Sequence, residues 1–478
     1  MSTAALEPDS PTSSDAVQAG FDRLKEAWRR QERPLTLGER EALLEKLAQW
    51  ILGHQQDVVE AIDGDFGGRS AHETLMAEVW VVVTGIRHTQ RHLKGWMRPE
   101  RKGVYWVLLP ATAEIQRQPL GVVGIISPWN YPFQLAVAPL VAAVAAGNKV
   151  YLKPSELTPR TSELLARMIA DVFPEDHVTS VLGGADAGAA FSALPFDHLL
   201  FTGSTRVGRL VMQAAAKNLT PVTLELGGKS PAVVHPSYDV KTAAERIAYG
   251  KCLNAGQTCI APDYALLQKD RVQPFLDALK QVVGARFPTL ADNGDYTAIV
   301  NEQHRKRIRG LLDEAEQKGA TLHWLHAEGA LDGTGKLGPV AVTGVTEDMA
   351  ILQEEIFGPV LPIVAVDSID EAVAYVNDHP RPLAMYVFDN DRTRVDAVLA
   401  RTTAGGVTVN DTILHIANEE LPFGGVGPSG IGAYHGEAGF RTFSHEKSVF
   451  RQARLNGGFL IQPPYGKAVE TLLKFVVR

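Results

Sequence analysis

The hydrophobic residues near the start of the chain recur at the spacing of a helix. The positions that would share one helical face are Val17, Phe21, Leu24 and Trp28. Thr36, followed three residues later by Glu39, has the pattern of a capping box and predicts the start of a second helix. The residues before the first helix, 1–16, are small, polar and acidic. We expect them to form a flexible arm rather than a signal peptide.

From about residue 120 the pattern changes to short, mostly apolar runs that alternate with helical segments. The predicted strands are Gly121–Ser127, Lys149–Lys153, Val178–Leu182, His198–Phe201, Val222–Leu226, Ala232–Val234, Tyr264–Leu267 and Val360–Val366. The predicted helices include Leu135–Ala146 and a segment ending at Phe173, with Thr158 as its N-cap and Pro159 in its first turn. Apolar strands separated by helices indicate parallel sheets that are covered on both faces. The pattern therefore predicts an α/β protein, with Gly227-Gly228 as a hinge between two halves.

The uncharged stretch from Gln118 to Asn148 could be mistaken for a membrane helix. Four prolines interrupt it, and Trp129-Asn130 is typical of a turn. A buried strand, a turn and a buried helix fit this pattern better. We therefore expect no membrane span and a cytoplasmic protein.

Composition narrows the class of protein. A length of 478 residues suggests two or three domains, and a content of 45% hydrophobic and 21% charged residues is typical of a folded enzyme. The 47 basic residues are outnumbered by 55 acidic ones, giving a net charge of -8, which argues against nucleic-acid binding as the main function. Two cysteines exclude a disulfide scaffold and a cysteine-rich zinc fold.

The two cysteines differ in their surroundings. Cys259 lies in the polar, glycine-containing segment GQTCIAP (256–262), where a thiolate nucleophile could be accessible. A free cysteine is more often a small buried hydrophobic residue, and that interpretation suits Cys252 better than Cys259.

Two carboxylates and one glycine-rich turn are further candidates. Glu225 ends an apolar strand, where burial would raise its pKa and suit it to general-base catalysis, although a structural ion pair is the alternative. Glu354-Glu355 reads as a solvated pair unless something positions it. Gly203 and Ser204 start a helix and could bind phosphate through backbone N–H groups, but a glycine chosen for packing is an equal alternative.

Metal-binding patterns are weak. His88 and His92 are four residues apart, as on one face of a helix, but no suitably spaced carboxylate accompanies them in the sequence. We expect a solvated helix face there and no metal site. No HExxH, CxxC or GxxxxGK[ST] motif is present, and the serine segment 427–430 lacks GxSxG spacing.

Taken together and in order, seven motifs closely resemble the aldehyde dehydrogenase superfamily from about residue 20 to residue 455. They are PWN (128–130), KPSE (153–156), FTGSTRVG (201–208), LELGGKSP (224–231), GQTC (256–259), EEIFGP (354–359) and PFGGVG (422–427). The ending LPFGGVGPSGIGAYHG resembles the class 3 branch. DFGGRS (65–70), NAGQTCIAPDY (254–264) and GFRTFSHEKSVF (439–450) resemble the bacterial coniferyl aldehyde dehydrogenases within that branch.

The resemblance implies three catalytic roles. Cys259 would attack the aldehyde carbon as a thiolate, giving a thiohemiacetal and then a thioester. The side-chain amide of Asn130 and the backbone N–H of Cys259 would stabilise the oxyanion. Glu225 would activate the water that hydrolyses the thioester.

The resemblance also implies a nicotinamide cofactor, with NAD preferred and NADP possible. Lys153 and Glu156 would hold the adenosine ribose, and Glu355 the nicotinamide ribose, which Phe357 borders. Gly203 and Ser204 would hold the pyrophosphate. Trp129 and Gly208 complete the predicted cofactor-binding set.

The fold implied is the aldehyde dehydrogenase fold, with two Rossmann-like parallel-sheet domains and a small β arm that joins the subunits of a homodimer. The expected divisions are a flexible arm (1–16), a dinucleotide-binding domain (17–100 and 120–226), a catalytic domain (227–430), an oligomerisation arm (101–119 and 440–455) and a C-terminal extension (456–478).

The function implied is NAD(P)-dependent oxidation of an aldehyde to the carboxylic acid. An aromatic, coniferyl-type aldehyde is the leading substrate, with a medium- or long-chain aliphatic aldehyde as the alternative. A CoA-acylating relative is less favoured because such relatives generally lack the base that Glu225 would supply. A non-enzymatic, crystallin-like protein is a further alternative, but every catalytic position is intact.

Overall fold

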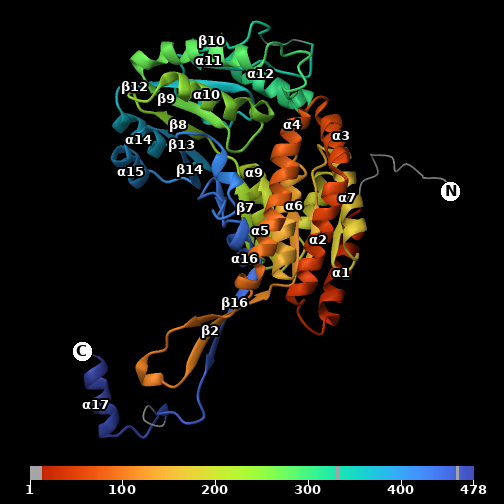
Figure 1. The fold of residues 1–478 in the computed structure, drawn as a ribbon, viewed down its shortest axis with the longest axis vertical. Helices are drawn as coiled ribbons and strands as arrows, with labels where there is room; N and C mark the ends of the chain where they lie inside the picture. The colour runs from red at the N-terminus through yellow and green to blue at the C-terminus, as the bar shows by residue number, and fades with distance from the viewer. Residues whose placement is uncertain (1–12, 330, 332, 459–461, 478) are drawn as a thin grey trace, which may run out of the picture.

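The computed structural model describes residues 13–329, 331, 333–458 and 462–477, and it contains three sheets (Figure 1). Most of the predicted N-terminal arm, residues 1–12, lies outside the described residues. The helix α1 (Ser14–Arg30) begins earlier than predicted, because the side chain of Ser13 caps it by accepting the N–H of Ala16. Its buried residues are Val17, Phe21 and Leu24, as the helical spacing predicts.

The first sheet has six strands in the order β15-β7-β6-β3-β4-β5. Its strands are β3 (Val122–Ile126), β4 (Lys149–Lys153), β5 (Val178–Ser180), β6 (His198–Gly203), β7 (Val222–Leu226) and β15 (Gly430–Ile431). All pair in parallel except β15, which runs antiparallel to β7. The helices of this half are α2 (Leu37–Gly53), α3 (Gln55–Phe66), α6 (Gln134–Ala146), α7 (Pro159–Val172), α8 (Ala185–Ser192) and α9 (Thr205–Ala216). The chain thus returns to the first sheet at β15, after it has built the second.

The second sheet has seven strands in the order β10-β11-β12-β9-β8-β13-β14. Its strands are β8 (Ser230–Val234), β9 (Pro262–Gln268), β10 (Thr321–Trp324), β11 (Val340–Thr343), β12 (Val360–Val366), β13 (Ala384–Phe388) and β14 (Gly406–Val409). Only β10 is antiparallel to its neighbour. The helices here are α10 (Val240–Cys252), α11 (Val272–Arg286), α12 (Glu302–Gln317), α13 (Ala350–Gln353), α14 (Ile369–Asp378) and α15 (Arg392–Arg401). Gly227-Gly228 lies between β7 and β8, where the chain passes from one sheet to the other.

The third sheet forms an arm that leaves the body of the molecule (Figure 1). Its strands are β1 (Glu100–Lys102), β2 (Thr112–Pro119) and β16 (Ser444–Arg451). The pairing of β2 with β16 runs antiparallel from Pro119 opposite Ser444 to Thr112 opposite Arg451. The short helix α16 (Gly436–Thr442) leads into β16, and α17 (Lys467–Val476) lies beside the arm.

Two predicted helix starts have different outcomes. The capping box at the start of α2 is present, because Thr36 accepts from the N–H of Glu39 and Glu39 accepts from the N–H of Thr36. The prediction that Thr158 caps α7 is wrong, since its side chain makes no capping bond. The carboxylate of Asp65 instead accepts from the N–H groups of residues 160 and 161. A side chain from α3 thus replaces the local cap.

A long helical segment beside α6 changes its winding. It runs through α4 (Ala71–Thr74), a π-helical turn at Leu75–Trp80 and α5 (Val81–Trp96). A π turn rotates the side chains that follow and often marks a functional site. No helix of the described residues is both long and apolar enough to cross a membrane.

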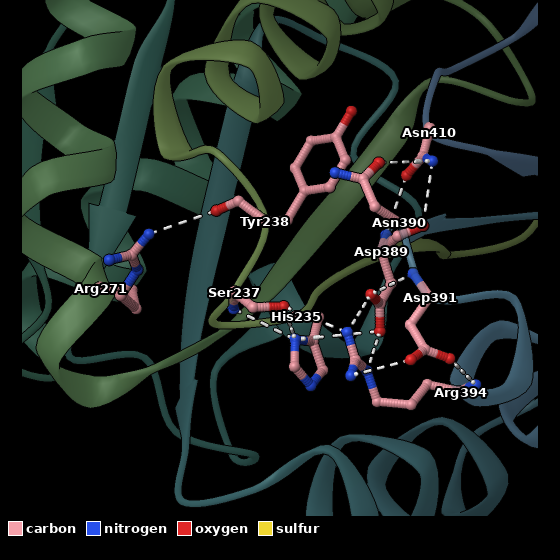
Figure 2. Close-up of polar contacts among 9 residues, drawn as sticks. All are labelled: His235, Ser237, Tyr238, Arg271, Asp389, Asn390, Asp391, Arg394 and Asn410. Carbon is pink, nitrogen blue, oxygen red and sulfur yellow. Dashed lines mark hydrogen bonds and ion pairs between the residues drawn. The ribbon is translucent and has the colours of Figure 1, made fainter.

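The carboxyl ends of the parallel strands in the second sheet are closed by an internal polar network (Figure 2). His235 follows β8, Asp389 follows β13 and Asn410 follows β14. Asp389 is bound by two nitrogens of Arg394 at 2.7 and 2.6 Å, and its N–H donates to the side chain of Asn410 at 2.9 Å. Ligands of α/β sheets commonly bind at carboxyl ends. Here the polar groups form hydrogen bonds with one another rather than facing a ligand site. The candidate active site lies in another part of the fold.

Candidate active site

Two connected cavities meet beside Cys259. The larger, of about 1220 Å³, is lined by residues that follow strands of the first sheet and by loops of the second. The smaller, of about 520 Å³, is lined mostly by apolar side chains from α5, α6 and the segment 413–440. Cys259 and Leu135 line both cavities. A molecule in either cavity can therefore reach the same thiol.

A strained turn presents Cys259 before β9. Asn254 and Ala255 have left-handed backbones with φ of 51° and 50°, and Gly256 follows with φ of 73°. A side chain at Gly256 would collide with the carbonyl oxygen of Gly358, so this position requires glycine. Residues held in such conformations cluster at functional sites.

The thiol of Cys259 is half-buried and its pKa is raised to about 12. Burial is the main cause, and the nearby carboxyl groups of Glu355 and Glu225 add to it, whereas the N–H groups of Cys259 and Ile260 oppose it. In this conformation the sulfur is protonated at neutral pH. Cys252 is buried, as predicted, and burial also raises its pKa to about 12.

Glu225 lies at the end of β7 and lines the larger cavity. Its side chain is buried, and neither carboxyl oxygen has a hydrogen-bond partner among the described residues. Burial raises the pKa of Glu225 well above its usual range. The alternative of a structural ion pair is wrong, because no basic side chain in the described part of the chain contacts these oxygens.

Glu354 and Glu355 have separate surroundings. Glu354 is exposed, as a solvated residue would be, but Glu355 has one carboxyl oxygen shut off from solvent and without a partner. Burial, and next the charge of Asp263, raise the pKa of Glu355 to about 8, while a hydrogen bond from the N–H of Gly228 opposes the shift. Arg307 donates to the backbone carbonyl of Glu355 at 3.2 Å. The expectation of a solvated pair is therefore wrong for Glu355.

The remaining predicted cofactor residues lie together in the larger cavity, with one exception. Those that line it are Trp129, Lys153, Glu156, Gly203, Ser204, Glu355 and Phe357. Ser204 caps α9, whose N-terminal N–H groups face the cavity and could bind a pyrophosphate. The ammonium of Lys153 contacts the carboxylate of Glu156 at 3.2 Å, and the rings of Trp129 and Phe357 lie 5.5 Å apart.

Gly208 is the exception. It is buried one turn into α9 and does not line the cavity. A Cβ at this position would come within 2.6 Å of the Leu226 side chain. Gly208 thus allows α9 to pack closely on β7 and makes no direct contact with a cofactor placed in the cavity.

Asn130 lies beside the turn 254–256 that precedes Cys259, and its side chain is buried. Its side-chain amide nitrogen donates to the backbone carbonyl of Gln257 at 3.2 Å. Its backbone carbonyl accepts from the side chains of Arg69 and Asn254, both at 2.9 Å. Neither Arg69 nor Asn254 was a candidate from the sequence. Both lie within quoted motifs, but nothing in their spacing indicated that they meet at Asn130.

The histidine pair on α5 also differs from its prediction. His88 is buried and stacks against His92 with the ring centres 4.3 Å apart. The carboxylate of Glu420 lies 3.7 Å from His88 and 3.9 Å from His92, so a distant segment supplies the acid that the local sequence lacks. Among the described residues these three form the single group whose ligand atoms are close enough to hold a metal ion. The expectation of a solvated face is wrong for His88.

The donor set of the larger cavity fits a dinucleotide. It combines a capped helix N-terminus for a pyrophosphate with polar groups that could bind ribose hydroxyls at either end, among them the unpartnered oxygen of Glu355. The fold and the site thus define an α/β oxidoreductase with a cysteine where a cavity that fits a dinucleotide meets an apolar cavity.

Comparisons with known proteins identify the family. The aldehyde dehydrogenase family profile matches residues 11–449. A protein named "Probable coniferyl aldehyde dehydrogenase" from Pseudomonas aeruginosa is 52% identical over 97% of this chain and 96% of its own length. The "Coniferyl aldehyde dehydrogenase" of Pseudomonas sp. strain HR199 is 44% identical over 98% of this chain and 97% of its own.

Solved structures of aldehyde dehydrogenases have the same fold as this chain. The substrate-bound AldH of Staphylococcus aureus superposes with a TM-score of 0.91 at 38% identity, covering 96% of this chain and 99% of that one. The NAD+ complex of a Bacillus cereus aldehyde dehydrogenase has a TM-score of 0.84 at 28% identity, covering 93% and 90%. The chain belongs to the aldehyde dehydrogenase family. It is an enzyme that oxidises aldehydes with a nicotinamide dinucleotide, NAD(P).

Proposed function

We propose that this enzyme oxidises an aromatic aldehyde of the coniferyl type, with Cys259 as nucleophile, Asn130 as oxyanion-stabilising donor and Glu225 as the base for hydrolysis. One observation carries the assignment of Cys259. It is the cysteine that lines both the dinucleotide-sized cavity and the apolar cavity, whereas Cys252 is enclosed in the core.

The side chains divide the reaction between them. The thiol of Cys259 first loses its proton to water, and the resulting thiolate bonds to the aldehyde carbon. The N–H groups of Asn130 and of the Cys259 backbone stabilise the oxygen without giving it a proton. When bound, the nicotinamide supplies the hydride acceptor that no side chain offers. Glu225, in its carboxylate form, then takes a proton from the water that attacks the thioester, and its raised pKa makes that carboxylate a stronger proton acceptor.

The smaller cavity supports an aromatic substrate. Its lining includes the rings of Trp80, Tyr131 and Phe440 and few polar groups. Flat aromatic aldehydes can stack against such walls, and two relatives that align over nearly the whole chain carry the name coniferyl aldehyde dehydrogenase. A medium- or long-chain aliphatic aldehyde is the alternative, because the same walls would bury a hydrocarbon chain.

A comparison of kcat/KM for coniferaldehyde and for an alkanal such as nonanal, followed by NADH absorbance, tests this proposal. We expect coniferaldehyde to be preferred by tenfold or more. Preference for the alkanal would refute the substrate assignment. A rate that depends on added CoA would refute hydrolysis as the final step.

We also propose NAD as the preferred cofactor. Glu156 is half exposed at the edge of the cavity and is held by Lys153. A carboxylate there can accept from ribose hydroxyls and would repel a 2′-phosphate, although Lys153 reduces the repulsion. A higher kcat/KM for NADP than for NAD would show that this role of Glu156 is wrong.

We further propose a homodimer joined through the arm. Tyr105, Trp106 and Leu109 near its tip and Phe450 on β16 are exposed. The three-stranded sheet also has open edges, because within the described residues β1 and β16 each pair with β2 alone. Exposed apolar side chains and unpaired strand edges are typical of surfaces covered by another subunit. Light scattering at micromolar concentration should give the dimer mass, and a monomer would contradict the proposal.

A further inference from the structure

A buried ion pair lies behind Asn130. Arg69, which follows α3, and Glu78, in the π-helical turn, both have fully buried side chains, and their charged groups lie 3.1 Å apart. The guanidinium also lies over the rings of Phe66 and Tyr131, with its carbon 4.9 and 4.8 Å from the ring centres. A buried ion pair is weak as a source of stability, because desolvation offsets the attraction. The hydrogen bonds that Arg69 and Glu78 make to the backbone indicate that the pair instead fixes the position of a neighbouring loop.

The ion pair holds both ends of one short loop. Arg69 donates to the backbone carbonyl of Asn130 at 2.9 Å. Glu78 accepts from the N–H groups of Phe133 and Gln134 at 2.8 and 3.0 Å, where α6 begins. Bonds to charged groups are stronger than neutral ones. The loop 130–134 therefore cannot move away from Arg69 and the π-helical turn without breaking charge-assisted hydrogen bonds at one end or the other.

The same loop is tied to the segment that leads into Cys259. The amide nitrogen of Asn254 donates to the carbonyls of Asn130 and Gln257 at 2.9 and 3.1 Å. The amide nitrogen of Asn130 donates to Gln257 at 3.2 Å. An amide group carries two N–H donors. One N–H of Asn130 is therefore used to orient its side chain, and the other is left for a ligand.

We propose that Arg69, through its ion pair with Glu78, is a positioning residue that holds the Asn130 amide where it can stabilise the oxyanion at Cys259. This inference rests on the role proposed above for Asn130. The physical reason is distance: an oxyanion donor acts only within hydrogen-bond reach of the developing charge. A displacement of about 1 Å can cost roughly 100-fold in rate.

The test is a double-mutant cycle measured as kcat/KM for the aldehyde at saturating NAD, which reports the steps through thioester formation. Arg69→Lys keeps the charge, but lysine is one bond shorter, so its ammonium cannot reach the position of Nη1, the guanidinium nitrogen that contacts both Glu78 and the backbone carbonyl of Asn130. We expect it to lower kcat/KM by about 10- to 100-fold. Asn130→Ala should lower it by about 100- to 1000-fold. In the Asn130→Ala background, Arg69→Lys should cost less than about threefold.

The outcomes separate the two proposals. If Arg69→Lys costs the same factor with and without Asn130, Arg69 does not act through Asn130 and this inference is wrong. If Asn130→Ala leaves kcat/KM unchanged, the role proposed for Asn130 fails instead. The affinity for NAD, measured by protein fluorescence, should stay within about twofold in Arg69→Lys. A large loss of affinity would indicate a general disturbance of the cleft and would overturn a specific positioning role.

Two further variants guard against loss of folding. Arg394→Lys makes the same substitution in the ion pair of Figure 2, at the far edge of the second sheet, and should leave kcat/KM unchanged. Glu78→Gln keeps the shape and an oxygen acceptor but removes the charge that holds Arg69. If Arg69→Lys does not yield soluble enzyme, Glu78→Gln takes its place in the double-mutant cycle with Asn130→Ala, and the same result is expected. Wild-type kcat/KM in Glu78→Gln would refute the proposal.

Discussion

Replacing Glu225 by glutamine should separate the two halves of the proposed reaction. Glutamine has nearly the same shape, and neither oxygen of Glu225 has a hydrogen-bond partner that the change would remove. The amide cannot take a proton from water. Thioester formation should therefore proceed while its hydrolysis stalls.

The expected magnitudes follow from the chemistry and from burial. A general base contributes about 100- to 10,000-fold, so steady-state turnover should fall by about that factor, after a burst of about one NADH per active site.

Stability should also respond to pH. Burial raises the folded-state pKa of Glu225 above that of the unfolded chain, so the folded protein holds a proton that the unfolded chain has released. Wild-type stability therefore falls by about 1.4 kcal/mol per pH unit from the unfolded pKa up to the folded pKa. The glutamine variant lacks this loss, so its relative stability should rise with pH across that window.

Rapid mixing with NAD and aldehyde measures the burst, and urea unfolding from pH 5 to pH 8 measures the difference in stability. Glu163→Gln, an exposed carboxylate on α7, is the matched control and should show neither effect. If Glu225→Gln binds NAD but gives no burst, Glu225 acts before thioester formation, for example on the thiol of Cys259, and the assignment to hydrolysis is refuted.

Four other substitutions test further parts of the proposal. Cys259→Ala should give neither burst nor turnover in the same assay while still binding NAD, whereas Cys252→Ala should remain active; an active Cys259→Ala would refute the covalent mechanism. Glu156→Gln should raise kcat/KM for NADP relative to NAD by about tenfold, because a charge that repels the 2′-phosphate is removed; an unchanged ratio would contradict its role. Asp389→Ala should lower the free energy of unfolding by about 2 kcal/mol, since Arg394 loses a charged partner. Its kcat should be unchanged, and a large fall in kcat would show that the network of Figure 2 reaches the site.

Local patterns in the sequence were sufficient for most of the secondary structure. Mostly apolar runs such as Val222–Leu226 and Val360–Val366 are strands with the predicted bounds, because a parallel strand is buried on both faces and shows this in its own residues. The capping box at Thr36 and Glu39 formed for the same reason, since all its partners lie within one turn.

The tertiary structure decided everything that depends on a partner distant in sequence. Asp65 replaced Thr158 as the cap of α7, and Glu420 joined the histidine pair on α5. Glu355 differs from its neighbour Glu354 only because the fold closes around one of them, and that burial sets its pKa. The sequence alone identified the candidate groups, but desolvation and hydrogen bonding across the two sheets determine which of them can act.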